Sequence, residues 1–179
     1  MRTFPLFVFL ALALVFAFML LRKTEPAALG SASNTPLPAI TVTALEGNAR
    51  WNPAALQGRV TLINFFASWC TPCAAEMPEL AALHKQFPAL HIEGVAWNDQ
   101  PDTLRPWLKK NGNPYRMLWF DKNGEATIDL GIKGIPESFV VDAKGMVRYH
   151  LTGPLTAEMR QGDFGALIEG LIAEAAHAK

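Results

Sequence analysis

The stretch of sequence that decides the fold reads VTLINFFASWCTPC and spans residues 60–73. Its first eight residues, Val60–Ala67, are apolar or β-branched except for Asn64, a composition typical of a buried strand. The residues after it, 70–87, place apolar side chains at helical spacing and predict a helix that starts at the cysteines and is kinked at Pro78. Cys70 and Cys73 are the only cysteines of the chain, so both lie where a strand passes into a helix.

This position indicates redox chemistry. A helix N-terminus presents unpaired N–H groups and a partial positive charge, which favour a thiolate over a thiol. A thiolate at Cys70 can attack a disulfide, and Cys73, one helical turn later, can resolve the mixed disulfide. We therefore predict Cys70 as the nucleophile and Cys73 as the resolving thiol of a redox-active disulfide.

A cysteine pair has three other uses: a structural disulfide, half of a metal site and covalent haem attachment. A structural disulfide over so short a loop removes little chain entropy. A metal site would need a second pair of ligands besides the two cysteines, and the four histidines show no ligand-like spacing. Covalent haem attachment needs a histidine directly after the second cysteine, where this chain has Ala74. We expect neither a metal nor a cofactor.

The remaining pattern predicts an α/β domain built around a central mixed sheet. Asp102 is expected to cap a helix that ends at Asn111-Gly112, and apolar residues at helical spacing predict a further helix over residues 164–172. Short runs rich in β-branched and aromatic residues predict six strands: Ile40–Ala44, Val60–Ala67, Ile92–Trp97, Arg116–Phe120, Ser138–Val141 and Val147–Leu151. The first of them is an extra N-terminal β segment.

Length and charge restrict the function. The 179 residues suit one globular domain, and 16 basic residues balance 16 acidic ones. Without residues 1–23, 13 basic and 16 acidic residues remain, and no basic block is present. This balance argues against nucleic-acid binding.

The N-terminus predicts a membrane anchor. Seventeen of the eighteen residues 4–21 are apolar, which is enough for a helix to cross about 30 Å of hydrocarbon. Cleavage as a signal peptide remains an alternative, because small residues follow at 28–33. We assign residues 1–23 to a transmembrane signal anchor, 24–38 to a flexible tether and 39–179 to the folded domain.

A second motif, Gly131–Phe139, places Pro136 at the entrance to a predicted strand. A cis Ile135–Pro136 bond would let the backbone lie against the cysteine pair. Only about one X-Pro bond in twenty is cis in folded proteins, so spacing alone favours an ordinary strand-edge proline.

The chain resembles the CcmG/DsbE family, membrane-anchored thioredoxin-like thiol:disulfide oxidoreductases of cytochrome c maturation. The resemblance covers roughly residues 38–172 and the layout of anchor and tether. Four motifs carry it: Asn64–Cys73 with Glu76 and Pro78, Gly112–Tyr115, Gly131–Phe139, and Gly153–Thr156. One departure is Ser138, where the family more often has threonine.

The resemblance implies a thioredoxin-like fold with Pro136 as a cis-proline beside the dithiol. It also implies that Glu76 and Glu137 give the dithiol acidic surroundings, where a carboxylate disfavours the Cys70 thiolate. For Glu76 alone, a solvated helix face is the alternative. Trp69, next to the nucleophile, and Ile135 are expected to contact substrate.

The implied function is reduction of disulfides in the haem-attachment cysteines of apocytochrome c, or in a thiol carrier that holds them. Electrons would come from a membrane thiol transporter, and the domain would face the bacterial periplasm from a single-pass anchor in the inner membrane. Two alternatives remain. One is a less selective anchored thiol reductase for another client. The other is a copper-delivery module, although such modules on this fold have a wider Cys-x-x-x-Cys spacing and a distant histidine.

Overall fold

The computed structural model describes Val8, Leu12 and residues 30–47 and 49–177. The predicted anchor, residues 1–23, therefore lies outside the described residues apart from Val8 and Leu12. Among the residues that the structure describes, no helix is both long and apolar enough to cross a bilayer.

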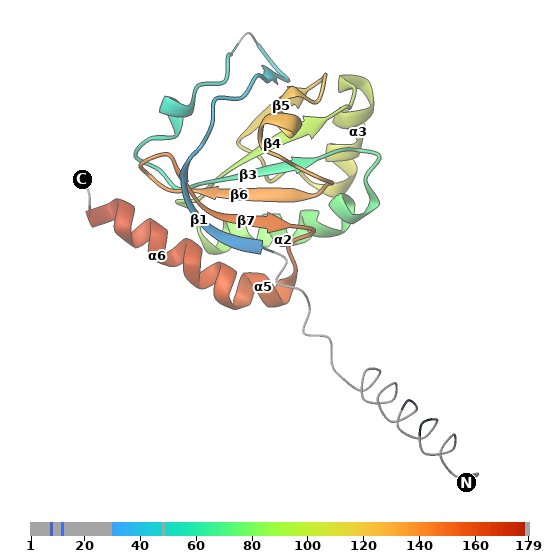
Figure 1. Cartoon of the computed structure of the whole chain (residues 1–179). Helices are drawn as coiled ribbons and strands as arrows, with labels where there is room; N and C mark the ends of the chain where they lie inside the picture. The colour runs from blue at the N-terminus through green and yellow to red at the C-terminus, as the bar shows by residue number, and fades with distance from the viewer. Residues whose placement is uncertain (1–7, 9–11, 13–29, 48, 178–179) are drawn as a thin grey trace.

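Seven strands form one mixed sheet in the order β1-β7-β6-β3-β4-β5-β2 (Figure 1). Strands β3, β4 and β5 are parallel, and each of the other four pairs antiparallel with its neighbours. Their bounds are β1 Gly30–Pro36, β2 Thr43–Ala44, β3 Thr61–Phe66, β4 His91–Trp97, β5 Met117–Asp121, β6 Glu137–Val141 and β7 Met146–Thr152. The predicted mixed sheet of an α/β domain is confirmed.

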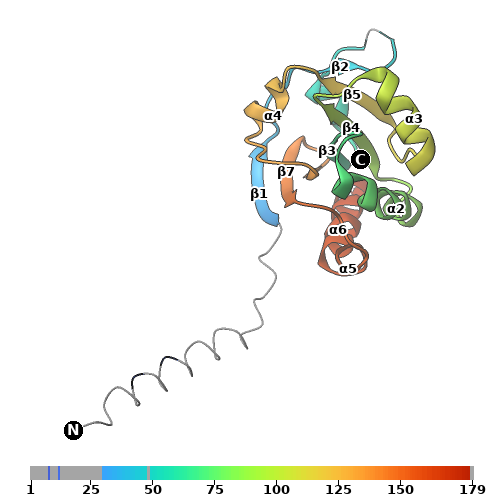
Figure 2. The same ribbon diagram turned by 90° about the vertical axis from the view of Figure 1, so that its right-hand side faces the viewer.

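Helices cover the sheet, as Figure 2 shows with α2, α3, α5 and α6 on one side and α4 on the other. Alternation along β3 divides the core, because Leu62 and Phe66 face the long helices while Ile63 and Phe65 face residues 37–56 and α4. The helices are α2 Thr71–Gln86, α3 Pro101–Asn111, α4 Glu125–Asp129, α5 Ala157–Gln161 and α6 Asp163–His177, with a 3-10 turn at Pro53–Leu56.

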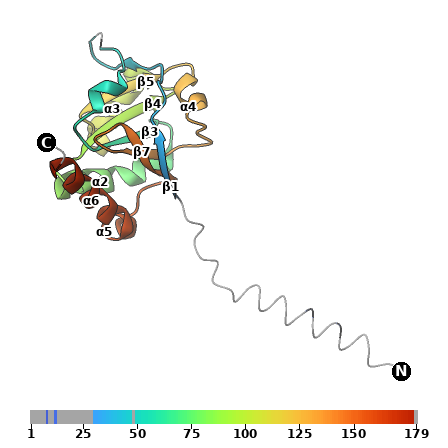
Figure 3. The same ribbon diagram turned by 60° about the vertical axis from the view of Figure 1, so that its left-hand side comes forward.

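Strand β1 corrects the predicted tether. Residues 30–36, expected to be flexible, pair with β7 at the edge of the sheet, with Gly30 opposite Leu151 and Pro36 opposite Met146 (Figure 3). The pairing is made by the backbone, and most side chains of β1 are exposed, so their polar composition carried no strand signal. At Gly30 a Cβ would collide with the ring of Tyr149, which explains why the strand begins on glycine.

Two element starts also differ from the sequence expectation. The extra N-terminal strand is only Thr43–Ala44 instead of Ile40–Ala44, because Ile40 and Val42 bury their side chains against the sheet face. Helix α3 starts at Pro101 with Gln100 as its N-cap, so Asp102 lies in the first turn rather than at the cap. The helix predicted over residues 70–87 is observed as Thr71–Gln86, with Pro78 inside it.

Gly94 in β4 offers a test of core packing. A Cβ at this position would lie 2.9 Å from Phe66 Cε1 and from Tyr115 Cγ and Cδ1, inside two packed rings. We expect Gly94→Ala to lower the free energy of unfolding by about 1–3 kcal/mol through overpacking. Denaturant unfolding monitored by circular dichroism measures this change in the free energy of unfolding.

A matched control is Gly170→Ala in α6, where an added Cβ would meet nothing within 4 Å. This variant is expected to raise stability by up to about 1 kcal/mol, because alanine has the better helix propensity. Equal stability of the two variants would contradict the packing described for Gly94.

Candidate active site

The two cysteines lie at the N-terminus of α2. Cys70 is the N-cap residue, its Sγ accepts a hydrogen bond from Cys73 N at 3.2 Å, and the two form a disulfide with their Cα atoms 5.3 Å apart. Cys70 keeps 5% of its surface exposed, whereas Cys73 is completely buried. Only the sulfur of Cys70 can therefore meet a partner protein, and the N–H group of Cys73 is placed to stabilise a thiolate there.

The loop before β6 borders the disulfide. The Ile135–Pro136 peptide bond is cis, and the carbonyl oxygen of Ile135 lies 3.7 Å from Cys70 Sγ. A disulfide sulfur carries no proton, so this is a contact in the oxidised protein, whereas a Cys70 thiol could donate to the same oxygen. Ile135 is half-buried: its side chain packs against the core, and its carbonyl oxygen borders the sulfur.

Trp69 stands out beside the disulfide with 56% of its surface exposed. Its indole N–H donates to Asn98 O at 3.2 Å, and its ring lies 5.8 Å from that of Trp97. Asp99 fixes the preceding residue, because its carboxylate accepts from Ser68 N at 2.6 Å and Ser68 Oγ at 2.9 Å. An exposed aromatic face is thus held rigidly next to Cys70, as a substrate contact requires.

Glu76 is buried, with 1% of its surface exposed, so its alternative placement on a solvated helix face is wrong. One carboxylate oxygen accepts from Asn64 Nδ2 at 2.9 Å and the other from Leu155 N at 3.0 Å. Burial raises the pKa of Glu76 to about 7, although both hydrogen bonds oppose that rise. A carboxyl group that can take or give a proton near neutral pH therefore lies one helical turn after Cys73.

Glu137 holds the loop before the cis-proline. Its Oε1 accepts from Lys133 N at 3.2 Å and from Gly134 N at 3.3 Å, while His150 Nε2 donates to its Oε2 at 2.6 Å. The imidazole of His150 stacks on Phe139 with 4.2 Å between ring centroids. Of the two predicted acidic residues, Glu137 is thus tied to the loop that presents Ile135, and Glu76 to the interior behind α2.

Sequence reasoning assigned no role to three residues around Glu76. Asn64 Nδ2 donates to Ser138 Oγ at 3.0 Å as well as to Glu76, and Tyr115 OH donates to Asn64 Oδ1 at 2.7 Å. The signal was present: Asn64 is a polar residue inside an otherwise apolar strand, and burying it requires hydrogen-bond partners. Among the described residues, no group of three or more His, Cys, Asp and Glu side chains could hold a metal ion.

Comparisons with known proteins also indicate thiol–disulfide chemistry. Residues 34–150 match the AhpC/TSA family. The chain is 34% identical to the thiol:disulfide interchange protein HelX of Rhodobacter capsulatus over 86% of this chain and 87% of HelX. It is 36% identical to the thiol:disulfide interchange protein DsbE of Vibrio cholerae over 96% of this chain and 95% of that protein.

A solved structure agrees with these relatives. The crystal structure of a thiol:disulfide interchange protein of the thioredoxin family from Chlorobium tepidum superposes with a TM-score of 0.62 at 30% identity. The match covers 79% of this chain and 99% of that one. The fold is therefore thioredoxin-like, with its mixed sheet and flanking helices.

Proposed function

Because the chain belongs to the AhpC/TSA family and to the DsbE-type thiol:disulfide interchange proteins, we propose that its Cys70–Cys73 dithiol reduces disulfides in apocytochrome c or in its thiol carrier. The chain is a thioredoxin-like thiol:disulfide oxidoreductase; the direction of electron flow and the client are the proposal. The observation that carries it is the asymmetry of the pair: Cys70, at a helix N-terminus, keeps 5% of its surface exposed, whereas Cys73 is completely buried.

The cycle starts from the disulfide form and needs two electrons, for which we propose a membrane thiol transporter as donor. The Cys70 thiolate then attacks one sulfur of the client disulfide, and the other client sulfur leaves as a thiolate. Cys73 loses its proton and attacks Cys70 Sγ, which releases the second client sulfur and restores the Cys70–Cys73 bond. The client has gained the two electrons.

Glu76 is proposed as the proton acceptor for Cys73. Residues three apart on a helix have Cβ atoms about 5–6 Å apart, a separation that one water molecule can bridge. Its pKa of about 7 means that a large fraction of the carboxyl group is ionised at neutral pH and can take the proton. The carboxylate also disfavours a second negative charge on the dithiol, which keeps Cys73 protonated until it is needed.

The exposed aromatic surface and the loop backbone are proposed to receive the client. Trp69 offers an exposed apolar face beside Cys70, and the Ile135 carbonyl oxygen lies 3.7 Å from the Cys70 sulfur. An extended client segment around a Cys-x-x-Cys pair fits between them, since it needs one apolar contact and one backbone acceptor.

The proposal is tested with the reduced protein and an oxidised peptide carrying the Cys-x-x-Cys-His sequence of a haem-attachment site. We expect rapid reduction of the peptide and a reduction potential nearer to the roughly −270 mV of thioredoxin than to the roughly −120 mV of the oxidant DsbA. A potential as oxidising as that of DsbA would exclude the reductase direction. Intact c-type cytochromes after deletion of the gene would exclude the client.

We also propose that residues 1–23 anchor the protein in the bacterial inner membrane with the dithiol in the periplasm. The support is the apolar run at 4–21 and the need of a dithiol reductase for an oxidising compartment in which its client forms disulfides. Resistance of the full chain to alkaline extraction, together with protease access in spheroplasts, is the expected result. Release by alkali would contradict the anchor.

A further inference from the structure

We propose that Tyr115 is a positioning residue for the dithiol, because its hydroxyl group fixes the Asn64 amide in the orientation that donates a hydrogen bond to Glu76. The inference rests on the proposed use of Glu76 as the proton acceptor for Cys73. It adds a residue that touches neither the sulfurs nor the client.

The hydrogen bonds form a continuous chain across the interior. Tyr115 OH donates to Asn64 Oδ1 at 2.7 Å, and Asn64 Nδ2 donates to Glu76 Oε1 at 2.9 Å. Asn64 lies in β3, Glu76 in α2, and Tyr115 two residues before β5, so these hydrogen bonds join three separate segments of the fold. All three residues are buried, with 7% or less of their surface exposed, so water does not compete for these bonds.

The Asn64 amide has two possible orientations, and only one satisfies its neighbours. In the observed one, the NH₂ group serves both Glu76 and Ser138, and the oxygen accepts from Tyr115. In the reversed one, the amide oxygen would face the Glu76 carboxylate, and the NH₂ group would face a hydroxyl that prefers to donate. The Tyr115 hydroxyl also lies 3.4 Å from Met77 Sδ, but a thioether is a weak acceptor.

The Tyr115 hydroxyl keeps its donor proton at all pH values at which the dithiol works. Burial, with a smaller contribution from the charge of Glu76, raises the pKa of Tyr115 well above the ordinary value of 10. The phenol is therefore a permanent donor, and the polarity of the Asn64 amide does not change as Glu76 titrates.

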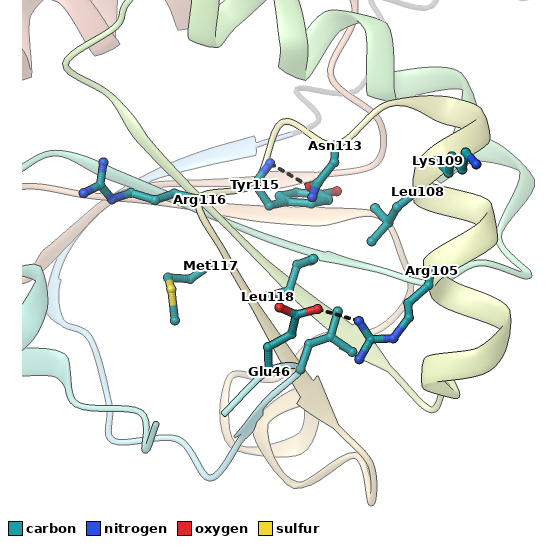
Figure 4. Close-up of a pocket in the computed structure, with 10 residues that line it drawn as sticks. Glu46, Arg105, Leu108, Lys109, Asn113, Tyr115, Arg116, Met117 and Leu118 are labelled. Carbon is teal, nitrogen blue, oxygen red and sulfur yellow. Dashed lines mark hydrogen bonds and ion pairs between the residues drawn. The ribbon is translucent and has the colours of Figure 1, made fainter. Parts of the chain in front are cut away.

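The ring of Tyr115 is held in place from several sides. It stacks on Phe66 with 4.7 Å between ring centroids, and Gly94 leaves the space that the two rings occupy. Its backbone N–H donates to Asn113 Oδ1 at 3.1 Å, as the close-up in Figure 4 shows. There the ring lies in the wall of a groove of about 470 Å³ between α3 and β5. A ring fixed in this way can orient an amide.

The hydrogen bond from the Asn64 amide is one of the few interactions that control the pKa of Glu76. Only two groups lower the pKa of Glu76, the Leu155 N–H and the Asn64 amide. Tyr115, from the segment before β5, is a titratable group that senses the charge of Glu76, whereas Cys73 in α2 is held in the disulfide and does not titrate. Toward α5, α2 carries the Glu79–Arg160 ion pair at 2.8 Å, whose opposite charges offset each other. The strands β3 and β6 contribute the neutral side chains of Asn64 and Ser138.

The test compares Tyr115→Phe with Tyr149→Phe, the only other tyrosine of the chain, which packs edge-on against Phe164 at 5.8 Å. Titration of Glu76 in the oxidised protein is followed by carboxyl carbon NMR. The pH profile of mixed-disulfide resolution by Cys73 is measured in parallel with a small disulfide as probe. We expect Tyr115→Phe to move the Glu76 midpoint and the resolution profile upward by roughly half to one pH unit. Tyr149→Phe should leave both unchanged.

Asn64→Ala and the double variant give an independent measure. If Tyr115 acts through Asn64, then Tyr115→Phe adds nothing to the shift caused by Asn64→Ala. An unchanged Glu76 midpoint in Tyr115→Phe, or additive shifts in the double variant, would overturn the inference, and Tyr115→Phe alone decides if Asn64→Ala does not fold. A moved midpoint with an unmoved resolution profile would also overturn it, because Glu76 would not be the acceptor. Reduction of the haem-site peptide, measured separately, would still stand.

Discussion

Replacing Cys73 by alanine is expected to leave the protein covalently attached to its client through Cys70. Cys70 remains accessible and keeps its place at the N-terminus of α2, so it still attacks the client disulfide. The sulfur that would displace the client is gone, so the mixed disulfide accumulates. Turnover should fall by at least about a thousandfold, as it does when a nucleophile that works with a partner group is removed.

The adduct is measured by non-reducing gel electrophoresis and mass spectrometry after acid quenching of cells that express Cys73→Ala. The matched control is Cys70→Ala, in which the remaining sulfur is buried and should form no adduct. Adducts that form on Cys73 of the control, and not on Cys70 of the trapping variant, would reverse the roles assigned to the two cysteines. The identity of the trapped protein also tests the proposed client.

Glu76→Gln is expected to remove a pH-dependent loss of unfolding free energy of up to about 3 kcal/mol in the oxidised protein. The pKa of Glu76 is about 7 in the folded state and 4.5 without the fold. The folded state therefore binds more protons than the unfolded state between these pH values. Stability falls as pH rises from about 4.5 to 7, and above that range the full cost of the buried charge remains.

The comparison is the difference in unfolding free energy between wild type and variant, measured by denaturant at several pH values from 4 to 8. We expect this difference to move in favour of the variant as pH rises through that range. The amide of glutamine satisfies the Asn64 and Leu155 donors less well, which adds a loss of stability that does not depend on pH. The change of the difference with pH is therefore the informative quantity. Glu79→Gln, in the same helix and ion-paired with Arg160, should cost less than about 1 kcal/mol. A difference that does not depend on pH would contradict a raised pKa at Glu76.

Much of the fold could be predicted from residues 60–73 and the strand pattern. Both faces of β3 are buried, so polar and apolar residues do not alternate along it. The apolar run at residues 60–67, followed by a helical pattern, therefore predicts this strand and the helix after it correctly. Strand β1 could not be predicted from the sequence, because its pairing with β7 is made by backbone groups that every residue carries.

The site was only partly visible in the sequence. The buried stripe of α2 contains Cys73, Met77 and Leu80, and position 76 falls on the same stripe, so the burial of Glu76 had a signal in the spacing. Its raised pKa had none, because the rise comes from burial by segments distant in sequence, and the hydrogen bonds from Asn64 and Leu155 that oppose the rise are also distant in sequence. The contact between Ile135 and Cys70 likewise joins residues 65 positions apart.

With the membrane anchor that we propose, the pairing of β1 would also determine which end of the domain faces the bilayer. Gly30 lies opposite Leu151, Leu151 opposite Ser138, and Ser138 opposite Asn64, so the chain enters the sheet in the row of residues behind the dithiol. That row is about 14 Å wide from β1 to β3. With the proposed anchor ending at residue 23, the covalent connection to Gly30 spans about 25 Å at most. The dithiol would then work within a thin layer at the membrane surface, where an electron donor embedded in the membrane can reach it and a freely diffusing client must come to it.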